Sequence, residues 1–580
     1  MPDCPFNPAA ENIADLIYRF GSLQSERWNN TSSLCADYVS SDYIILHMPL
    51  TPDAVSMRVH PYYMIPSLFS PLDYNAMEAS GILSAFNSPA LNNQGKGVLI
   101  GLVDTGIDYR SPLFQNPDGT TRIAGIWDQS VPIEEDVLPA GVPDYYPMGG
   151  SSYGTEYTRE QINEALASDD PLSLVPTQDT IGHGTFLAGL AAGSSIPQED
   201  FTGAAPEAEL AVVKLKPAKK YLRDFYLIPS DAPAFQENDI MMGIKYLRMM
   251  ADRLKKPLVI LLAMGSNSGS HIGTSPLSQV TQNYSGFFGI ITVIAGGNET
   301  GAAHHFYASI PAGTEYEDVE IRVGKEEAER GFVLELWAAD ADTYTVGFIS
   351  PSGERISRIP IIANNETSIP FLLDATTITV NYQLIEAESG SQLIFMRFQT
   401  PAAGIWTVRV YNTQRFKGTF HMWLPVQGMI SEETVFLRPD PYSTITVPGN
   451  SRLPITVGAY DTSTGGIYIH SSRGFTPNQI VKPELAAPGV NILGPSVGRK
   501  PGSDTPMTTR TGTSAAAAIT AGANLLGWGI VEGNYPTMSE ASVKSYLIRG
   551  AQRNPALTYP NREFGYGTLD LFQTFLRLRE

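Results

Sequence analysis

Four short apolar runs, each ending close to glycine or polar residues, most constrain the fold of this 580-residue chain. They are GVLIGLV (97–103), AELAVVKL (208–215), PLVILLAMG (257–265) and GIITVIAGG (289–297). Runs of this length and composition are typical of strands buried on both faces of a parallel sheet. A helix-like segment, ENDIMMGIKYLRMMADRL (237–254), lies between two of them. Strands that alternate with helices predict an α/β fold with a doubly wound parallel sheet.

From about residue 315 to residue 430 the apolar period changes to two, and turn residues separate the runs. The alternating positions include Tyr344, Val346 and Phe348. This pattern predicts an antiparallel β-sandwich inserted into the α/β domain. The α/β pattern resumes with PITVGAYD (454–461). A chain of this length is too long for one core. We therefore expect a first unit at 1–75, an α/β domain in two parts at 76–314 and 431–580, and an insert at 315–430.

The first unit has its own pattern. ENIADLIYRF (11–20) predicts a helix, SDYIILHMPL (41–50) predicts a strand, and the proline-rich HPYYMIPSLFSPLDY (60–74) predicts an extended segment.

Charge and composition exclude several classes of protein. The net charge of −20 argues against nucleic acid or an anionic membrane as a partner, because both require a positive face. No run of about 18 apolar residues occurs, so no membrane span is expected. No metal-ligand spacing is evident, and we expect neither metal nor cofactor. The first residues lack the basic and apolar regions of a signal peptide, which favours a protein kept inside the cell. In that setting Cys4 and Cys35 are expected to be free thiols, although the pair can also bridge.

Three short motifs in the α/β parts carry chemistry. Asp104 ends a predicted strand in VDTGID, His183 opens a predicted helix in GHGTFLAG, and Ser514 opens another in GTSAAAA. Read singly, they suit a turn former, a helix-start residue and a helix N-cap. In an α/β sheet, however, strand ends and helix N-termini line one crevice. An acid, an imidazole and a hydroxyl placed there meet the needs of nucleophilic acyl transfer, and the order Asp, His, Ser is one known for this chemistry. An esterase-like α/β-hydrolase is excluded, because G-x-S-x-G is absent at Ser514.

These three motifs resemble the signatures of subtilisin-like serine peptidases. The resemblance implies that Asp104 is the acid, His183 the general base and Ser514 the nucleophile. It also implies that Asn298, in AGGNETG (295–301), donates its side-chain amide to the oxyanion. The alternative for Asn298 is a helix or turn cap before Glu299. Asp108 is assigned a structural role.

The same resemblance implies where a peptide binds. Ala263, Met264 and Gly265 would offer backbone groups to an extended substrate, as an added strand does. The backbone of Gly296 and Gly297, with Met264, would form the rim of the pocket for the residue before the scissile bond. The expected partners are therefore a protein or peptide substrate and the chain's own first unit.

A narrower resemblance is to the Csp-type subtilases of spore-forming clostridia. It rests on the large insert, on RIAGIWDQS, GGNETGAAHH and YPNREFGYGTLDLFQTFLRLR, and on the alanine-rich GTSAAAA. It implies that the insert is a jelly roll and that residues 1–75 are a prodomain whose tail stays in the active-site groove. It further implies self-cleavage between Ser67 and Ala79, action on the proform of a spore cortex-lytic hydrolase, and a location in the cytoplasm or the spore. Three alternatives stay open: a non-catalytic signalling member, an intracellular degradative peptidase, and a first unit that is a permanent domain.

Overall fold

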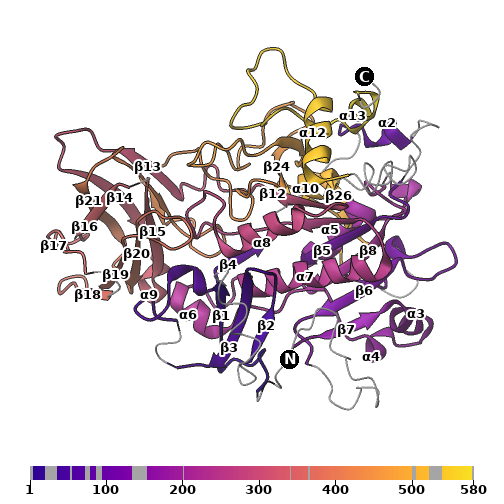
Figure 1. Cartoon of the computed structure of the whole chain (residues 1–580), viewed down its shortest axis with the longest axis horizontal. Helices are drawn as coiled ribbons and strands as arrows, with labels where there is room; N and C mark the ends of the chain where they lie inside the picture. The colour runs from indigo at the N-terminus through magenta and orange to yellow at the C-terminus, as the bar shows by residue number, and fades with distance from the viewer. Residues whose placement is uncertain are drawn as a thin grey trace.

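The computed structural model (Figure 1) describes residues 4, 6–19, 35–51, 55–71, 79–86, 94–132, 153–199, 201–339, 341–362, 366–498, 505–521 and 538–577. At its centre is an eight-stranded sheet in which all neighbouring strands are parallel except the edge pair β6–β7. In spatial order the strands are β25 (Leu485–Pro488), β24 (Ile455–Tyr460), β12 (Ile290–Ala295), β10 (Leu258–Leu262), β5 (Leu99–Asp104), β8 (Glu209–Lys214), β6 (Ile123–Asp128) and β7 (Thr155–Thr158). The four apolar runs supply β5, β8, β10 and β12, so the predicted α/β sheet is confirmed.

Helices cover both faces of this sheet. Successive residues of β5 enter two different cores, because side chains alternate between the faces of a strand. The first core includes α5 (His183–Ala192), α10 (Thr513–Thr520), α12 (Glu540–Gly550) and α13 (Leu571–Arg577). The second includes α7 (Glu237–Leu254) and α8 (Pro276–Ser285). The bounds of α7 are those predicted from its sequence.

The remaining short elements around this sheet are η2 (Pro112–Phe114), α2 (Ile82–Phe86), α3 (Arg159–Ala167), α4 (Pro171–Leu174), η4 (Pro197–Glu199), α6 (Lys220–Tyr226), β26 (Ile492–Pro495) and β27 (Met507–Arg510).

The first unit contains a three-stranded antiparallel sheet in the order β1 (Ile13–Arg19), β3 (Tyr43–Pro49) and β2 (Ala36–Tyr38). The strand predicted at 41–50 is confirmed as β3. The helix predicted at 11–20 is wrong, because this segment is β1. Its first five residues are all buried, so apolar side chains occupy both faces and the period-two signal of a strand is lost. Pairing with β3 along its whole length then decides the conformation.

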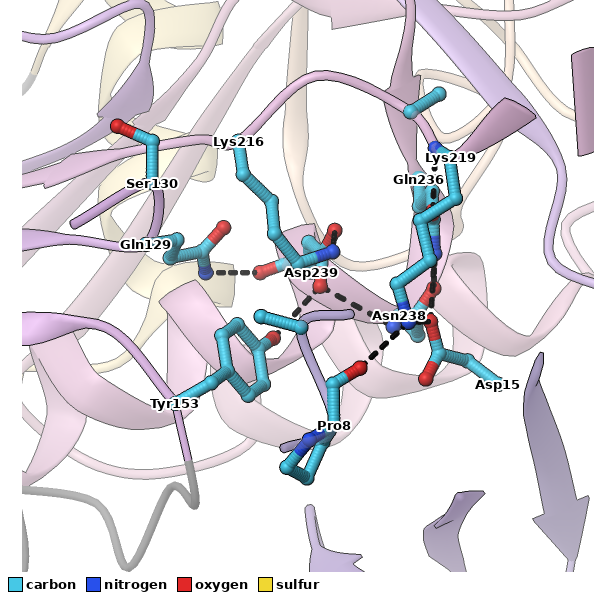
Figure 2. A network of polar contacts seen from close by, with 12 residues as sticks. Pro8, Asp15, Gln129, Ser130, Tyr153, Lys216, Lys219, Gln236, Asn238 and Asp239 are labelled. Atoms are coloured by element: carbon cyan, nitrogen blue, oxygen red, sulfur yellow. Dashed lines mark hydrogen bonds and ion pairs between the residues drawn. The ribbon is translucent and has the colours of Figure 1, made fainter. Parts of the chain in front are cut away.

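A buried polar network joins this unit to the α/β domain (Figure 2). The Asp15 carboxylate of β1 forms an ion pair with Lys219 at 2.8 Å and accepts a hydrogen bond from the Gln236 amide at 2.9 Å. Lys219 also donates to the backbone carbonyl oxygens of Pro8, at 2.6 Å, and Ile13, at 3.0 Å. A buried charge is stable only when it is paired in this way, so Lys219 and Asp15 depend on each other across the interface.

His47 of β3 makes the stability of this network depend on pH. Its ring nitrogens contact the carboxylates of Asp15 at 2.8 Å and Asp37 at 3.2 Å. Burial by itself lowers the pKa of His47, but the hydrogen bonds to both carboxylates outweigh it and raise that pKa from 6.5 to about 9. Because the folded pKa is raised, the contribution to stability is full below pH 6.5 and is lost as pH rises through 9. The difference between these two pKa values corresponds to at most roughly 3 kcal/mol in the free energy of unfolding.

We therefore expect the midpoint of thermal denaturation to fall more between pH 6.5 and pH 9.5 in the wild type than in the His47→Gln variant. Gln keeps a polar group between the two carboxylates but cannot carry the charge. Differential scanning calorimetry at the two pH values measures this. Equal falls in both proteins would show that His47 does not provide the pH dependence.

The extended segment predicted at 60–74 contains the 3₁₀ turn η1 (Tyr62–Met64) and then the strand β4 (Leu68–Pro71). β4 lies between two strands of the α/β domain and pairs antiparallel with both. Leu68 and Phe69 face β9 (Phe235–Gln236), and Ser70 and Pro71 face β11 (Met264–Gly265). The chain thus inserts its own segment between two edges of the α/β domain. The predicted cleavage region extends from Ser67 past Pro71, and residues 72–78 lie outside the described residues.

The insert is an antiparallel sandwich of two sheets with a shared core. One sheet has the order β13 (His305–Ser309), β22 (Thr419–Trp423), β15 (Phe332–Ala338), β20 (Leu393–Gln399), β19 (Thr377–Gln383) and β18 (Glu366–Pro370). The other has the order β17 (Arg355–Ile356), β16 (Thr343–Ile349), β21 (Gly404–Gln414), β14 (Tyr316–Val323) and β23 (Val435–Phe436). The short helix α9 (Glu327–Arg330) precedes β15. The strands run from His305 to Phe436, beyond the expected limits of 315 and 430 at both ends. The identification as a jelly roll stays a prediction.

The sandwich also packs against the first unit and α6. Trp337 and Phe395 share a core with Tyr62 and Leu68 of the first unit. The Tyr62 hydroxyl donates to the Glu335 carboxylate at 2.7 Å. The segment that leads into β4 is therefore held from two sides, by the sandwich and by the α/β domain.

Other expectations concern cysteines, metals and membranes. The structure joins Cys4 and Cys35 in a disulfide, so the expectation of free thiols is wrong. The two Cα atoms are 4.8 Å apart, within the range that a disulfide requires. Within the described ranges, no helix is both long and apolar enough to cross a membrane. The same residues contain no group of three His, Cys, Asp or Glu side chains placed to hold a metal ion.

Candidate active site

Asp104 and His183 meet at the carboxyl end of the central sheet. β5 ends at Asp104, and α5 begins at His183. The His183 Nδ1 atom lies 2.7 Å from the Asp104 Oδ1 atom, and both residues are 2% exposed. An ionised carboxylate only accepts hydrogen bonds, so Nδ1 carries the ring proton. The Nε2 atom then keeps the lone pair that a general base uses.

Asp179 holds these two residues in place, and our sequence analysis missed it. Its Oδ1 atom accepts hydrogen bonds from the Thr105 hydroxyl at 2.9 Å and the Gly182 backbone N–H at 2.8 Å. Its Oδ2 atom accepts from the Thr185 backbone N–H at 2.8 Å and the Thr185 hydroxyl at 2.7 Å. Asp179 thus ties the turn after β5 to the first turn of α5. An Asp four residues before the motif histidine was the available signal.

Gly184 permits the close approach of helix and turn. A Cβ atom at this position would lie 2.2 Å from the backbone oxygen of Gly106 and 3.2 Å from Asp104 Oδ1. No other residue fits unless the Gly106 backbone in the turn after Asp104 moves. The glycine after His183 is therefore part of the geometry of the acid–base pair.

Ser514 lies in the first turn of α10, which packs against α5. The N-cap of α10 is Gly512, so Ser514 is not the helix cap. Ser514 is fully buried. Among the residues that the structure describes, its Oγ atom has no hydrogen-bond partner. A hydroxyl that capped the helix would accept a hydrogen bond from its backbone, whereas the Ser514 hydroxyl makes no such bond among these residues.

Asn298 follows β12 and is tied to the start of the same helix. Its Oδ1 atom accepts a hydrogen bond from the Thr513 backbone N–H at 3.1 Å. The neighbouring Gly297 N–H donates to the Thr513 hydroxyl at 3.1 Å. With Oδ1 fixed in this way, the two amide hydrogens of Asn298 are the donors that remain for another group close to Ser514. Asn298 therefore bonds the start of a helix that is distant in the sequence, the first turn of α10. It does not cap a helix that begins at Glu299.

If Asn298 stabilises an oxyanion, the Asn298→Ala variant should lose on the order of 10²–10³ in kcat with little change in KM. The amide would contact the developing charge and not the bound ground-state peptide. Steady-state hydrolysis of a peptide measures both constants. The Gln427→Ala variant is the matched control, because the Gln427 side chain donates to the Asn298 backbone carbonyl at 2.7 Å and leaves the side-chain amide untouched. A loss confined to KM would contradict the assignment.

The predicted substrate-binding residues lie on two adjacent segments. Met264 and Gly265 form β11, next to Ala263 at the end of β10, and they already pair with β4. Gly296 and Gly297 follow β12. Both glycines use their backbone groups inside the protein: the Gly296 carbonyl accepts from Thr446 N–H at 3.0 Å, and the Gly297 carbonyl accepts from Ser472 N–H at 2.8 Å. They are therefore placed to shape a wall and not to bond a peptide.

A family model described as the subtilase family matches residues 95–349 and 438–567. Asp104, His183 and Asn298 fall in the first matched range and Ser514 in the second. The solved structure of the CspB protease of Clostridium perfringens is 30% identical, with a TM-score of 0.74, and covers 87% of this chain and 98% of that chain.

Curated relatives are more distant. The subtilisin-like protease SBT3.12 of Arabidopsis thaliana is 24% identical over 81% of this chain and 59% of its own length. The subtilisin-like protease SBT3.5 of the same plant is 23% identical over 87% of this chain and 64% of its own length. The chain thus spans less than two thirds of the length of these relatives.

Proposed function

Because the chain belongs to the subtilase family, we propose that it is a serine endopeptidase with Asp104, His183 and Ser514 as its catalytic triad. The observation that carries this proposal is the buried contact of Asp104 Oδ1 with His183 Nδ1 at 2.7 Å, beside the helix that bears Ser514. That contact fixes the tautomer in which His183 Nε2 can accept a proton. A solvent-exposed pair would be free to rotate, whereas this one is held by burial and by Asp179.

In this mechanism His183 takes the proton of Ser514 as Oγ attacks the carbonyl carbon of the scissile bond. Asp104 stabilises the imidazolium that forms, without taking its proton. The Asn298 amide and the Ser514 backbone N–H donate to the oxyanion, which also lies at the positive end of the α10 dipole. His183 then gives its proton to the leaving amine, the peptide bond breaks, and an acyl-enzyme remains. Water attacks this ester by the same steps in reverse order.

The first unit is proposed to be a prodomain whose tail the enzyme cleaves. Support comes from β4, which pairs with β11 at one edge and β9 at the other. An added strand of this kind is how a peptidase holds an extended substrate. The first unit also stays attached through the Asp15–Lys219 ion pair and the core shared with the sandwich, so cleavage need not release it.

The physiological substrate is proposed to be a specific proprotein, such as a spore cortex-lytic zymogen during germination. Support comes from the motifs that resemble the Csp-type subtilases and from the 30% identity with the CspB protease over most of both chains.

A fluorophosphonate probe tests the proposed chemistry. We expect one adduct on Ser514 in the folded wild type, mapped by peptide mass spectrometry, and none in the His183→Ala variant, where the base is missing. Heat-denatured wild type controls for non-specific labelling. Absence of the adduct from folded wild-type protein would instead favour a non-catalytic member that signals by binding.

A further inference from the structure

A cavity of about 830 Å³ is lined by residues of both the sandwich and the α/β domain. The sandwich contributes the outer face of β22. Phe420 and Met422 of this strand enter the core between the two sheets, so His421 points the other way and lines the cavity. The α/β domain contributes segments that follow the sandwich, including Arg562. The volume is within the range of cavities that hold small molecules. None of the described residues that line it belongs to the proposed triad.

A pair of histidines leaves one hydrogen-bond acceptor open to this cavity. His305 Nδ1 lies 3.2 Å from the Asp440 backbone carbonyl oxygen, which only accepts, so Nδ1 carries a proton. Burial holds the pKa of His305 well below 6.5, so the ring is neutral and its Nε2 atom accepts the proton of His421 Nδ1 at 2.9 Å.

The other nitrogen of His421 is the open acceptor. Burial lowers the pKa of His421 from 6.5 to about 3, so this ring is neutral as well and its Nε2 atom keeps a lone pair. In the part of the chain that the structure describes, this atom has no hydrogen-bond partner. It therefore accepts only from a hydroxyl or N–H group that enters the cavity.

The charged residues of the lining favour an anion. The Arg562 guanidinium lies over the rings of Tyr442, at 4.5 Å, and Phe475, at 5.7 Å. Among the described lining residues, Lys417 and Arg562 are the cations and Asp440 is the one carboxylate. One oxygen of Asp440 already accepts from the Tyr442 backbone N–H at 2.8 Å. In a chain whose net charge is −20, a cavity with more cations than carboxylates is a local exception.

A tyrosine supplies an apolar surface beside the acceptor. Tyr307 of β13 pairs with His421 of β22 across the sheet, and their ring centroids are 4.9 Å apart. Tyr307 also lines the cavity and is 42% exposed. An open aromatic ring next to polar groups suits a ligand that has both an apolar face and hydroxyls.

We propose that this cavity binds a sugar acid, whose carboxylate pairs with Arg562, whose hydroxyl donates to His421 Nε2 and whose ring packs on Tyr307. The planar guanidinium matches a carboxylate through two parallel hydrogen bonds. A carboxylate without hydroxyls leaves His421 Nε2 unpaired, and a neutral sugar leaves Arg562 unpaired. Because a desolvated polar group without a partner costs affinity, the site selects a molecule that carries both groups.

Isothermal titration calorimetry on the purified full chain tests this with three probes: glucuronate, glucose, which lacks the carboxylate, and cyclohexanecarboxylate, which lacks the hydroxyls. We expect glucuronate to bind about 10- to 100-fold more tightly than either of the others. No binding of glucuronate, or equal affinity for all three probes, would overturn the inference. The result does not depend on peptidase activity, since the cavity and the triad share no residue among those described.

The Arg562→Gln variant locates the site. Arg562 is exposed, so its replacement should leave the fold intact and weaken glucuronate binding by about 10- to 100-fold with glucose unchanged. Arg549→Gln is the matched control, because it removes the same charge from an exposed position on α12 that does not line the cavity. Equal affinities of these two variants for glucuronate would place the binding elsewhere and contradict the proposal.

The His421→Phe variant tests the acceptor. Phenylalanine keeps a ring beside Tyr307 but has no lone pair, so glucuronate and glucose should both bind about 3- to 10-fold more weakly. Unchanged affinity for both would show that His421 does not contact the ligand. Should this variant fail to fold after losing the bond to His305, the Arg562→Gln comparison decides the proposal without it.

Discussion

The Ser514→Ala variant is expected to remain a single unprocessed chain of 63.0 kDa and to lose peptide hydrolysis by on the order of 10⁶-fold. Alanine removes the only oxygen that can form the acyl-enzyme and leaves the helix intact, because alanine is the best helix former. Intact-mass spectrometry after purification reports processing, and steady-state kinetics report hydrolysis in trans.

The Thr520→Ala variant is the control for this experiment. Thr520 is the last residue of the same helix, and its hydroxyl donates to the Ala516 carbonyl at 2.7 Å and not to Ser514. It should process and hydrolyse as the wild type does. Processing of Ser514→Ala to the wild-type mass would show that another group, or another protein, makes the cut.

The Asp104→Asn variant should lose about 10⁴-fold in kcat at neutral pH, with little change in KM. Asparagine has nearly the same shape, but it has no charge to stabilise the imidazolium. Its amide can also present a donor to Nδ1, which moves the ring proton to Nε2 and leaves the wrong nitrogen for the base. Steady-state kinetics with a peptide substrate give both constants.

Asp108→Asn is the matched control, since Asp108 is also a buried aspartate that follows β5. Its carboxylate faces the Arg110 side chain at 2.8 Å, and its backbone N–H donates to the Thr185 hydroxyl. The variant should keep activity within about tenfold, because the side-chain partner of Asp108 is Arg110 and not His183. A loss as large as that of Asp104→Asn would remove the distinction between the catalytic and the structural aspartate.

The sequence was sufficient for the inner strands β5, β8, β10 and β12 of the central sheet, for α7, and for the place of Asp104 and His183. Each depends on a local signal. A strand buried on both faces requires a continuous apolar run, and an amphipathic helix requires apolar residues at helical spacing. The Asp104–His183 contact follows because strand ends and helix starts meet at one edge of a parallel sheet. β1 shows the limit of such signals: with both faces buried, its apolar residues match a helix and a strand equally well, and only β3 decides between them.

Other features depend on residues that are far apart in the chain, and no local sequence pattern predicts them. The ion pair of Asp15 with Lys219 and the hydrogen bond between Asn298 and the Thr513 backbone each join segments separated by more than a hundred residues. The side chains involved are ordinary ones, and their roles come from where the fold buries them.

By itself, then, the sequence indicated which residues would perform the proposed chemistry, because acid, imidazole and hydroxyl must come from particular side chains in recognisable turns. The tertiary structure decided two further matters. Among the described residues the Ser514 Oγ atom has no hydrogen-bond partner, and β4 of the first unit lies between β9 and β11. Those outcomes depend on packing and on burial, which are properties of segments brought together and not of any one of them.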